Sequence, residues 1–391
     1  MNTTPLSLLL ENAFIQKNLN KKLSEVALLL SRNPSLDKEY IINQINGIQK
    51  SKAKIPSFYE NPNIIYPTGL SLEQCSSEKT ATYKSSILTG KTLIDLTGGF
   101  GIDSYFFSRK MHVTYLEPDK NLFEIVKQNF EVLNPTIDCY HSTCENFIET
   151  TTQTYDIAYI DPSRRNANDR VYKLKDCSPD VIDLLPKLLK ITKKVLIKTS
   201  PLLDIKQTLH DLENVSKVWV VSVENECKEV LYCVENKLNH NPEIAAVNLD
   251  KINTEFSFTF DEEKVSEVQY SLPQKFLYEP NSSILKSGGF RCVAQRYKIN
   301  KLNTNTHLYT SEKLLENFQG RTFSIQAVID FQYKSFKTLN IKKANVSVRN
   351  FPDNIEQIKK KLKLNDGGEI YLFATRNIEN NPVLIITKKV I

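Results

Sequence analysis

The sequence lacks long apolar segments, because none of its hydrophobic runs approaches the roughly 18 residues that cross a membrane. Its start has no basic segment, and the apolar run at residues 8–10 is followed by Glu11, so we expect no signal peptide. Hydrophobic residues make up 40% and charged residues 25% of the 391 positions, which excludes disordered, collagen-like and fibrous proteins. At about 150 residues per domain, the sequence predicts a soluble globular protein of two or three domains.

Histidine and cysteine are also sparse. The five histidines are isolated, and no H-E-x-x-H motif occurs. The cysteines are odd in number and form no C-x-x-C pair, which favours reduced thiols in the cytoplasm over disulfides or a zinc knuckle. We therefore expect a cytoplasmic protein without a structural metal. The seven cysteines are Cys75, Cys139, Cys144, Cys177, Cys227, Cys233 and Cys292.

The net charge of +6 is unevenly distributed. Residues 331–391 carry twelve Lys or Arg against five Asp or Glu, whereas residues 81–330 carry a small negative excess. A basic C-terminal segment indicates a polyanionic partner such as nucleic acid. A solvated lysine-rich surface is the alternative that charge alone leaves open.

The chain begins with a predicted helical region over residues 1–80. Residues 6–54 show the apolar periodicity of two or three short helices. Three prolines within residues 56–67 predict an extended linker. Residues 76–87 predict another helix with a serine as its N-cap.

Residues 81–240 alternate between predicted strands and helices, which indicates an α/β, Rossmann-like domain with helices on both faces of a parallel sheet. Only residues 224–228 separate the last two strands, which is too short for a parallel crossover and therefore predicts a hairpin. The expected seven-stranded sheet then ends in one antiparallel strand. The strands are expected at 93–96, 113–117, 138–141, 156–160, 194–199, 217–223 and 229–234, and the helices at 102–110, 119–133, 179–190 and 204–212.

Beyond residue 241 the pattern changes to α+β. We expect a connecting domain over residues 241–320 and a C-terminal domain over residues 321–391. Strands are expected at 276–279, 307–310, 323–331, 344–351, 369–375 and 383–387, and helices at 282–295 and 354–363.

A glycine-rich turn, Thr-Gly-Gly-Phe-Gly at residues 97–101, joins the first strand of the α/β domain to its helix. Glycine lets backbone pass close to a ligand, and in a doubly wound sheet this turn opens the ligand crevice. A plain strand–helix turn is the alternative for the glycines alone. Asp95 inside the apolar strand needs hydrogen bonds from a ligand or loop, because an uncompensated buried carboxylate is costly. Glu117 ends the second strand, where an acid binds ribose hydroxyls in dinucleotide-type folds.

The glycine pattern fits a nicotinamide dehydrogenase poorly, because Gly99-x-Gly101 is followed by Ser104 where G-x-G-x-x-G requires glycine. With the acid in the first strand and the terminal hairpin, the segment resembles motif one of the S-adenosylmethionine-dependent class I methyltransferases. That resemblance implies a loop around the methionine part of the cofactor and an acid on its ribose. The usual acid after the third strand is Thr143 here, so adenine contact would rest on backbone at Cys144. The implied cofactor residues are Asp95, Thr97, Gly98, Gly99, Gly101, Glu117, Cys144 and Asp161.

A second motif, Asp-Pro-Ser-Arg-Arg, follows the fourth strand at residues 161–165. It resembles the D-P-P-x and N-P-P-x motifs of enzymes that methylate nucleic-acid bases. The resemblance implies that Asp161 and the Pro162 carbonyl accept hydrogen bonds from an exocyclic amine and orient its lone pair. Arg164 and Arg165 are suited to bind a phosphate or carboxylate through paired hydrogen bonds. A local turn capped by Asp161 is the alternative interpretation.

Lys198 and Ser200, at the end of the fifth strand, are expected to face the same crevice and contact substrate. Neither this segment nor residues 161–163 contains a cysteine, so the covalent chemistry of cytosine-C5 methyltransferases is disfavoured. Methylation of a base nitrogen is favoured instead. Displacement at a sulfonium methyl group depends mainly on positioning and needs no metal.

Six segments share their residues with one bacterial group: Leu-Glu-Gln-Cys-Ser-Ser-Glu at 72–78, the motif at 161–165, Lys-Thr-Ser-Pro at 198–201, Phe-Leu-Tyr-Glu-Pro-Asn at 276–281, Val-Arg-Asn-Phe-Pro at 348–352 and Asp-Gly-Gly at 366–368. The chain resembles class I methyltransferases with an N-terminal helical region, a ferredoxin-like segment and a C-terminal THUMP-like domain. THUMP domains bind structured RNA, which agrees with the basic C-terminal segment. The resemblance implies tRNA or rRNA as partner and makes Arg349, Lys360 and Lys361 candidate phosphate contacts.

We therefore predict a cytoplasmic S-adenosylmethionine-dependent methyltransferase that acts on a base nitrogen of structured RNA. Methylation of a protein or a small molecule is one alternative. A non-catalytic RNA-binding protein whose Rossmann domain senses the cofactor is another. We expect no association with membranes.

Overall fold

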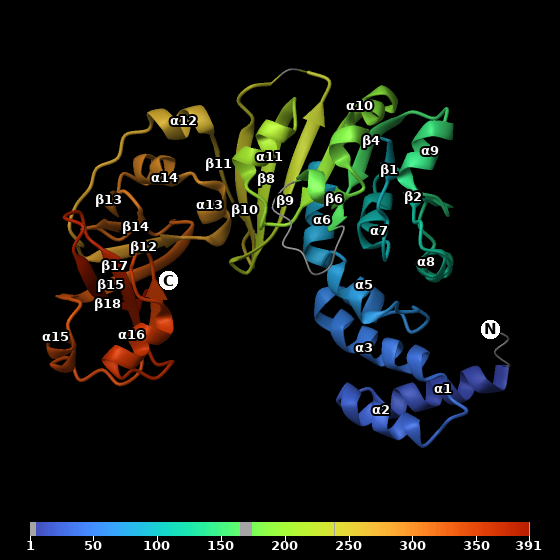
Figure 1. Ribbon diagram of the computed structural model, residues 1–391, viewed down its shortest axis with the longest axis horizontal. Coiled ribbons are helices and arrows are strands. Elements are labelled where there is room, and N and C mark those ends of the chain that lie inside the picture. The colour runs from blue at the N-terminus through green and yellow to red at the C-terminus, as the bar shows by residue number, and fades with distance from the viewer. Residues whose placement is uncertain (1–4, 165–173, 238, 391) are drawn as a thin grey trace. The chain divides into compact units, whose positions relative to one another are not determined.

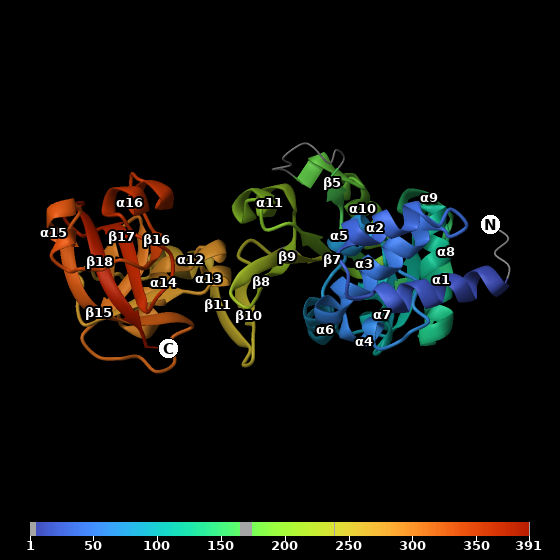
Figure 2. The same cartoon turned by 90° about the horizontal axis from the view of Figure 1, so that it is seen from below.

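The computed structural model describes residues 5–164, 174–237 and 239–390. The chain forms two compact units, Met1–Asn214 with Tyr232–Leu238 and Val215–Leu231 with Asn239–Ile391. Figures 1 and 2 show the labelled elements from two directions. In the described ranges, no helix combines the length and the apolar character needed to span a membrane.

The N-terminal region is helical, as predicted (Figure 1), and its first helices pack around a small apolar core. Val26, Ile41 and Ile45 are fully buried in this core. The expected extended linker is partly wrong, because a short helix begins at Pro56, and proline is favoured in the first turn of a helix. Ser77 caps the last helix of this region by accepting a hydrogen bond from a backbone N–H, as predicted. The helices are α1 (Pro5–Asn18), α2 (Leu23–Ser31), α3 (Lys38–Lys54), α4 (Pro56–Tyr59), α5 (Gly69–Gln74) and α6 (Glu78–Ile87).

Five parallel strands follow in the order β3-β2-β1-β4-β7. In their register, Asp95 lies beside Tyr115 of β2 and Tyr159 of β4. The residues that follow β1, β2 and β4 therefore meet at one edge of the sheet. The strands are β1 (Thr92–Asp95), β2 (His112–Leu116), β3 (Ile137–Tyr140), β4 (Tyr155–Ile160) and β7 (Thr192–Thr199), and the helices are α7 (Ile102–Ser108), α8 (Lys120–Leu133), α9 (Cys144–Thr150), α10 (Val181–Ile191) and α11 (Ile205–Asp211).

The sheet has nine strands rather than the seven predicted, in the order β11-β10-β8-β9-β7-β4-β1-β2-β3. β8 (Val215–Val223) and β9 (Glu226–Glu235) form the predicted hairpin, and both residues of the turn at 224–225 have positive φ, as two-residue hairpin turns require. The additional strands come from the predicted connecting segment. β10 (Glu243–Leu249) pairs in parallel with β8, and β11 (Thr254–Thr259) pairs antiparallel with β10.

A second sheet has the order β13-β14-β12-β15-β18-β17-β16. β12 pairs antiparallel with both β14 and β15, so the connecting and C-terminal segments share one sheet. The helix predicted at 282–295 is divided at Gly288, whose φ of +85° ends a helix. The strands are β12 (Phe276–Pro280), β13 (Asn300–Asn303), β14 (Thr306–Ser311), β15 (Gly320–Asp330), β16 (Asn345–Val348), β17 (Ile370–Arg376) and β18 (Pro382–Lys389). The helices are α12 (Phe260–Val265), α13 (Ser282–Ser287), α14 (Phe290–Tyr297), α15 (Tyr333–Lys337) and α16 (Ile355–Leu362).

Alternate residues of β17 and β18 enter two different cores of this sheet. Leu372 and Leu384 belong to the core that contains residues of α15 and α16. Phe373 and Ile385 belong to a second core, shared with Leu277 of β12. Because successive strand residues point to opposite faces, burial of both faces explains the continuous apolar run of β18.

Candidate active site

The glycine-rich loop after β1 is packed too tightly to accept a side chain at Gly98 or Gly101. A Cβ atom on Gly98 would lie 2.0 Å from Cε2 of the Tyr115 ring. Gly101 has a φ of +77°, and a Cβ atom there would lie 2.7 Å from Cζ of Phe130. The Tyr115 hydroxyl donates to the carbonyl of Gly99 at 2.7 Å and holds the loop against β2. Packing therefore confines Gly98 and Gly101 to glycine, whereas Gly99 between them has a φ of +53° and no atom closer than 3.9 Å to the Cβ it would acquire.

Asp95 ends β1 with its carboxylate buried under this loop. One oxygen accepts a hydrogen bond from the Thr97 N–H at 3.1 Å, and the other accepts from the Ser104 hydroxyl at 2.6 Å. Burial raises the pKa of Asp95 to about 7, against the opposing effect of the Ser104 hydrogen bond. The loop, through Thr97, and helix α7, through Ser104, thus supply the donors that a buried Asp95 needs.

Glu117 follows β2 at the same edge of the sheet and is also buried. Its two oxygens accept backbone hydrogen bonds, one from Gly99 at 2.9 Å and one from Asp119 at 2.8 Å. Burial raises the pKa of Glu117, and these two hydrogen bonds oppose the rise. Each carboxylate oxygen has a second lone pair, so Glu117 is able to accept from a pair of ribose hydroxyls while it holds the loop.

Asp161 follows β4 and is joined to the glycine-rich loop through its backbone. Its N–H donates to the Thr97 hydroxyl at 2.7 Å. Its carboxylate forms an ion pair with Lys198 of β7. The Asp161 side chain is 33% exposed and that of Lys198 only 13%, so the carboxylate is the more accessible partner. Thr97, Asp161 and Lys198, which we expected at one crevice, are therefore in contact in the structure.

A buried lysine next to this site was not singled out from the sequence. Lys84 of α6 has no exposed side-chain surface, and its Nζ lies 3.2 Å from Oδ1 of Asp103 in α7. Oδ2 of Asp103 accepts from the Ser76 hydroxyl at 2.8 Å and from the Tyr159 hydroxyl at 2.7 Å. Burial alone would raise the pKa of Asp103, but Lys84, Lys198 and these hydrogen bonds together lower it. The only sequence signal was a lysine on the buried face of α6, where it requires a partner.

The remaining predicted site residues of this domain lie after β7, at the start of α9 and after β4. Ser200 directly follows β7, and its hydroxyl accepts from a backbone N–H at 3.3 Å. Cys144 is buried at the start of α9, where burial raises its pKa to about 12. Pro162 follows Asp161, and the backbone of Arg164 belongs to β5 (Ser163–Arg164), which pairs with β6 (Cys177–Ser178). Arg165 lies outside the described residues.

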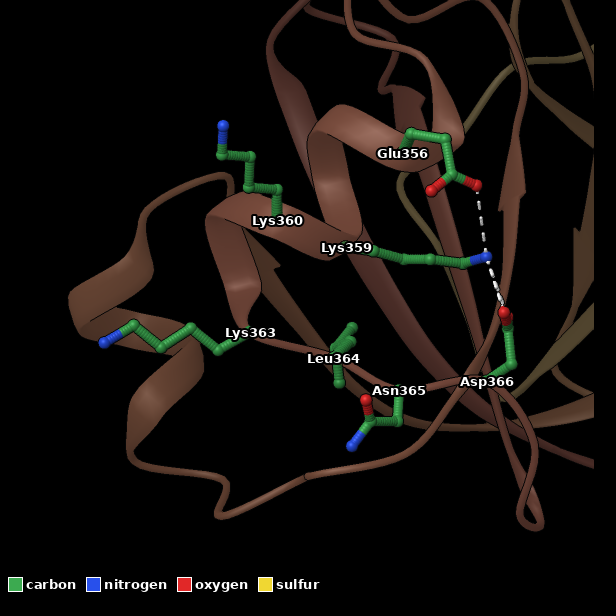
Figure 3. Close-up of a pocket in the computed structure, with 7 residues that line it drawn as sticks. All are labelled: Glu356, Lys359, Lys360, Lys363, Leu364, Asn365 and Asp366. Atoms are coloured by element: carbon green, nitrogen blue, oxygen red, sulfur yellow. Dashed lines mark hydrogen bonds and ion pairs between the residues drawn. The ribbon is translucent and has the colours of Figure 1, made fainter.

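The predicted phosphate contacts lie in the second unit, whereas Asp161 lies in the first. Lys361 forms an ion pair of 2.6 Å with Asp353, and the guanidinium of Arg349 donates to Glu279 at 2.6 Å. Figure 3 shows an open pocket beside α16, where Lys360 extends away from the other side chains. The pocket is lined by Glu356, Lys359, Lys360, Lys363, Leu364, Asn365 and Asp366. Among the described residues, no group of three or more His, Cys, Asp or Glu is placed to hold a metal ion.

Two family models match the C-terminal part of the chain. A ferredoxin-like domain matches residues 276–318, and a THUMP domain-like model matches residues 320–389. Partial structural matches include an rRNA methylase from Streptococcus thermophilus, with 13% identity, 41% of this chain and 95% of that chain covered, and a TM-score of 0.29. Another is the tRNA (uracil-54, C5)-methyltransferase of Pyrococcus abyssi, with 13% identity, 44% and 40% covered, and a TM-score of 0.30. No curated protein matches the chain.

A crystal structure of another protein matches this chain over its complete length. It is named "putative methyltransferase from Porphyromonas gingivalis W83", is 30% identical in sequence, covers 100% of both chains and has a TM-score of 0.87. The match thus extends over the N-terminal helices, the α/β sheet with its hairpin and both C-terminal segments. The chain therefore belongs to the family of bacterial class I methyltransferases that carry a ferredoxin-like and a THUMP-like domain.

Proposed function

We propose that the protein transfers a methyl group from S-adenosylmethionine to a base nitrogen of structured RNA, such as tRNA or rRNA. The position of Asp161 carries this proposal. Its partly exposed carboxylate follows β4, and its backbone is bound to the glycine-rich loop. This is the place at which base methyltransferases hold the acceptor for an exocyclic amine. The THUMP-like domain and the basic C-terminal segment support RNA as the substrate.

The residues at the edge of the sheet fit S-adenosylmethionine. Glycines at positions 98, 99 and 101 keep much of the loop backbone free of side chains, which suits close approach of the methionine part of the cofactor. Glu117 has lone pairs left for the ribose hydroxyls. When bound, the cofactor supplies an electrophilic methyl group on a sulfonium centre.

Asp161 would orient the nucleophile. Its carboxylate accepts a hydrogen bond from the exocyclic amine, so the nitrogen lone pair is directed into the crevice. Lys198 holds this carboxylate through the ion pair, and Thr97 holds the Asp161 backbone. Alignment of two reactants supplies roughly 7–11 kcal/mol of a reaction barrier, so positioning accounts for much of the rate.

The cysteines near this edge do not favour a covalent mechanism. Burial raises the pKa of Cys75 to about 11, although the charges of Lys54 and Lys198 oppose the rise. Buried thiols with a raised pKa are poor nucleophiles near neutral pH. Direct transfer to nitrogen therefore fits these residues better than attack through a cysteine.

The test is transfer of labelled methyl from S-adenosylmethionine to unmodified total RNA and, separately, to total protein. Asp161→Ala should reduce transfer to RNA by about 100-fold or more, because a mispositioned acceptor has that effect on rate. Its affinity for S-adenosylmethionine, measured by calorimetry, should change little. Glu149→Gln is the matched control, since Glu149 forms an exposed pair with Lys187 at 3.3 Å and transfer should be unaffected.

Other outcomes would identify other functions. Label in the protein pool alone would indicate a protein methyltransferase. Tight cofactor binding without label in either pool would indicate a small-molecule substrate or a non-catalytic cofactor sensor. If Asp161→Ala abolished cofactor binding, the residue would serve the cofactor and not the nucleophile.

A further inference from the structure

Two of the shared sequence segments, 276–281 and 348–352, are not explained by the methyl-transfer site. The structure joins them through Glu279 of β12 and Arg349, which directly follows β16. A third residue, Arg321 of β15, lies opposite Glu279 in the register of the two strands. These three residues, here named the two-arginine cluster, form a connected set of ion pairs within the second unit.

The two guanidinium groups share one carboxylate. Glu279 is 2% exposed, and its Oε1 accepts from Arg349 at 2.6 Å. Its Oε2 accepts from Nε of Arg321 at 2.8 Å and also from a terminal nitrogen of the same guanidinium. A further N–H of Arg349 donates to the carbonyl of Val348 at 2.7 Å. The buried carboxylate therefore fixes the orientation of both arginines.

The cluster retains donors and positive charge after these bonds are made. A guanidinium has five N–H donors, and among the described residues each arginine uses two of them. Two cations against one carboxylate leave a net charge of +1. The side chains of Arg321 and Arg349 are 32% and 37% exposed, so solvent reaches both while Glu279 is covered.

A half-buried histidine and a lysine lie near the two-arginine cluster. His307 of β14 has its pKa lowered to about 4 by burial and by the charges of Lys301 and Arg349. Nδ1 of His307 is buried, and no hydrogen-bond partner for it is found in the described part of the chain.

We propose that Arg321 and Arg349, oriented by the buried Glu279, form a binding site for a phosphodiester group of the RNA substrate. A planar guanidinium binds two oxygens of a phosphate through paired hydrogen bonds, and a fixed fork loses less entropy on binding than a free side chain. The inference rests on the proposed RNA substrate and adds the site that would hold the RNA backbone.

The experiment measures binding of the full chain to fluorescently labelled, unmodified tRNA transcripts between 50 and 200 mM salt, a range over which phosphate contacts weaken measurably. Arg321→Gln and Arg349→Gln should each weaken binding by about tenfold at low salt, as expected when a hydrogen bond between charged groups is removed. The slope of log affinity against log salt should also fall by about 0.9 for each phosphate that the variant no longer neutralises. Arg296→Gln is the control, because Arg296 forms an exposed pair with Glu262 at 2.9 Å and should change neither quantity.

A merely structural role would lower the melting temperature and leave the salt slope unchanged, and this result would overturn the proposal. If a Gln variant fails to fold, Arg321→Lys and Arg349→Lys are tested in its place. Lysine keeps the positive charge but lacks the paired donors of arginine. The proposal therefore requires that the Lys variants bind RNA more weakly with the salt slope of the wild type. Wild-type affinity in these variants would overturn the proposal. Absence of RNA binding by the wild type would overturn it as well. The methyl-transfer assay is independent: transfer to RNA together with unchanged salt slopes would refute the cluster and leave the proposed function intact.

Discussion

Two carboxylates of the active-site region, Asp95 and Asp103, are both buried, but different partners compensate them. Asp95 accepts hydrogen bonds from a backbone N–H and from a hydroxyl, and burial raises its pKa to about 7. Asp103 has the ammonium group of Lys84 at 3.2 Å, and its pKa is lowered although burial opposes this. Only an opposite charge, and not neutral donors alone, offsets full desolvation here.

The raised pKa of Asp95 predicts a pH-dependent stability. A carboxyl with a folded-state pKa above its unfolded value, about 4, contributes fully below that pH and loses its contribution as the pH rises to about 7. The free energy of unfolding of the wild type, relative to Asp95→Asn, should therefore fall between pH 4 and 7. Urea unfolding followed by circular dichroism at several pH values measures this. If the difference in free energy of unfolding between the wild type and Asp95→Asn did not vary with pH, Asp95 would not have a raised pKa in the folded protein.

Lys84→Met should destabilise the first unit by about 3–5 kcal/mol, because it leaves Asp103 charged, buried and without its cation. The double variant Lys84→Met/Asp103→Leu removes both charges and should recover part of the loss. Lys187→Met is the control, since an exposed pair contributes at most about 1 kcal/mol. Chemical denaturation measures the free energy of unfolding of all three variants. Equal effects of Lys84→Met and Lys187→Met would show that the buried pair has no special role.

At the scale of elements, the loop between β1 and α7 depends on close packing. We expect Gly98→Ala to lower the affinity for S-adenosylmethionine and to reduce stability by about 1–3 kcal/mol, as overpacking commonly does. Its Cβ would lie 2.0 Å from the fully buried Tyr115 ring, which must then move together with the loop it holds. Calorimetric titration measures the affinity.

Gly288→Ala is the matched control for this loop. Gly288 has a φ of +85°, but no atom lies within 4 Å of the Cβ it would acquire. This substitution strains the backbone without a steric clash, so it should reduce stability and leave cofactor affinity unchanged. Unchanged affinity in Gly98→Ala as well would separate the loop from cofactor binding.

At the scale of the molecule, the ferredoxin-like and THUMP-like segments are not independent. β12 of the first pairs with β15 of the second, and Leu277 shares a core with Phe323, Phe373 and Ile385. The two segments, which match separate family models, should therefore unfold together.

Phe373→Ala tests this coupling, because it leaves a cavity in the shared core and should cost about 3–5 kcal/mol. Native-state hydrogen exchange should then speed up in both β12 and β15. Ile41→Ala, in the core of the N-terminal helices, should not affect these strands. Faster exchange in β15 alone would show that the segments open separately.

Local sequence patterns predicted most of the alternating elements of residues 92–235, the final hairpin and the glycine-rich loop, because these depend on residues that are close neighbours along the chain. The helix α9 and the short strands β5 and β6 were not predicted. Such patterns do not specify a strand's partner. Whether β10 pairs with β8, or β12 with β15, is decided by which sheet edge is available once the chain has folded.

Local sequence patterns likewise predicted only part of the candidate active site. The sequence indicated Asp95, Glu117 and Asp161 through their places at strand ends, which the register of a parallel sheet brings to one edge. It did not indicate that Lys84 pairs with Asp103, or that Glu279 joins arginines 42 and 70 residues away. These partners are far apart in sequence and meet only through tertiary packing, where burial of one charge requires the other. Local pattern thus determined the elements and the edge of the sheet, and the tertiary structure decided which charges compensate one another.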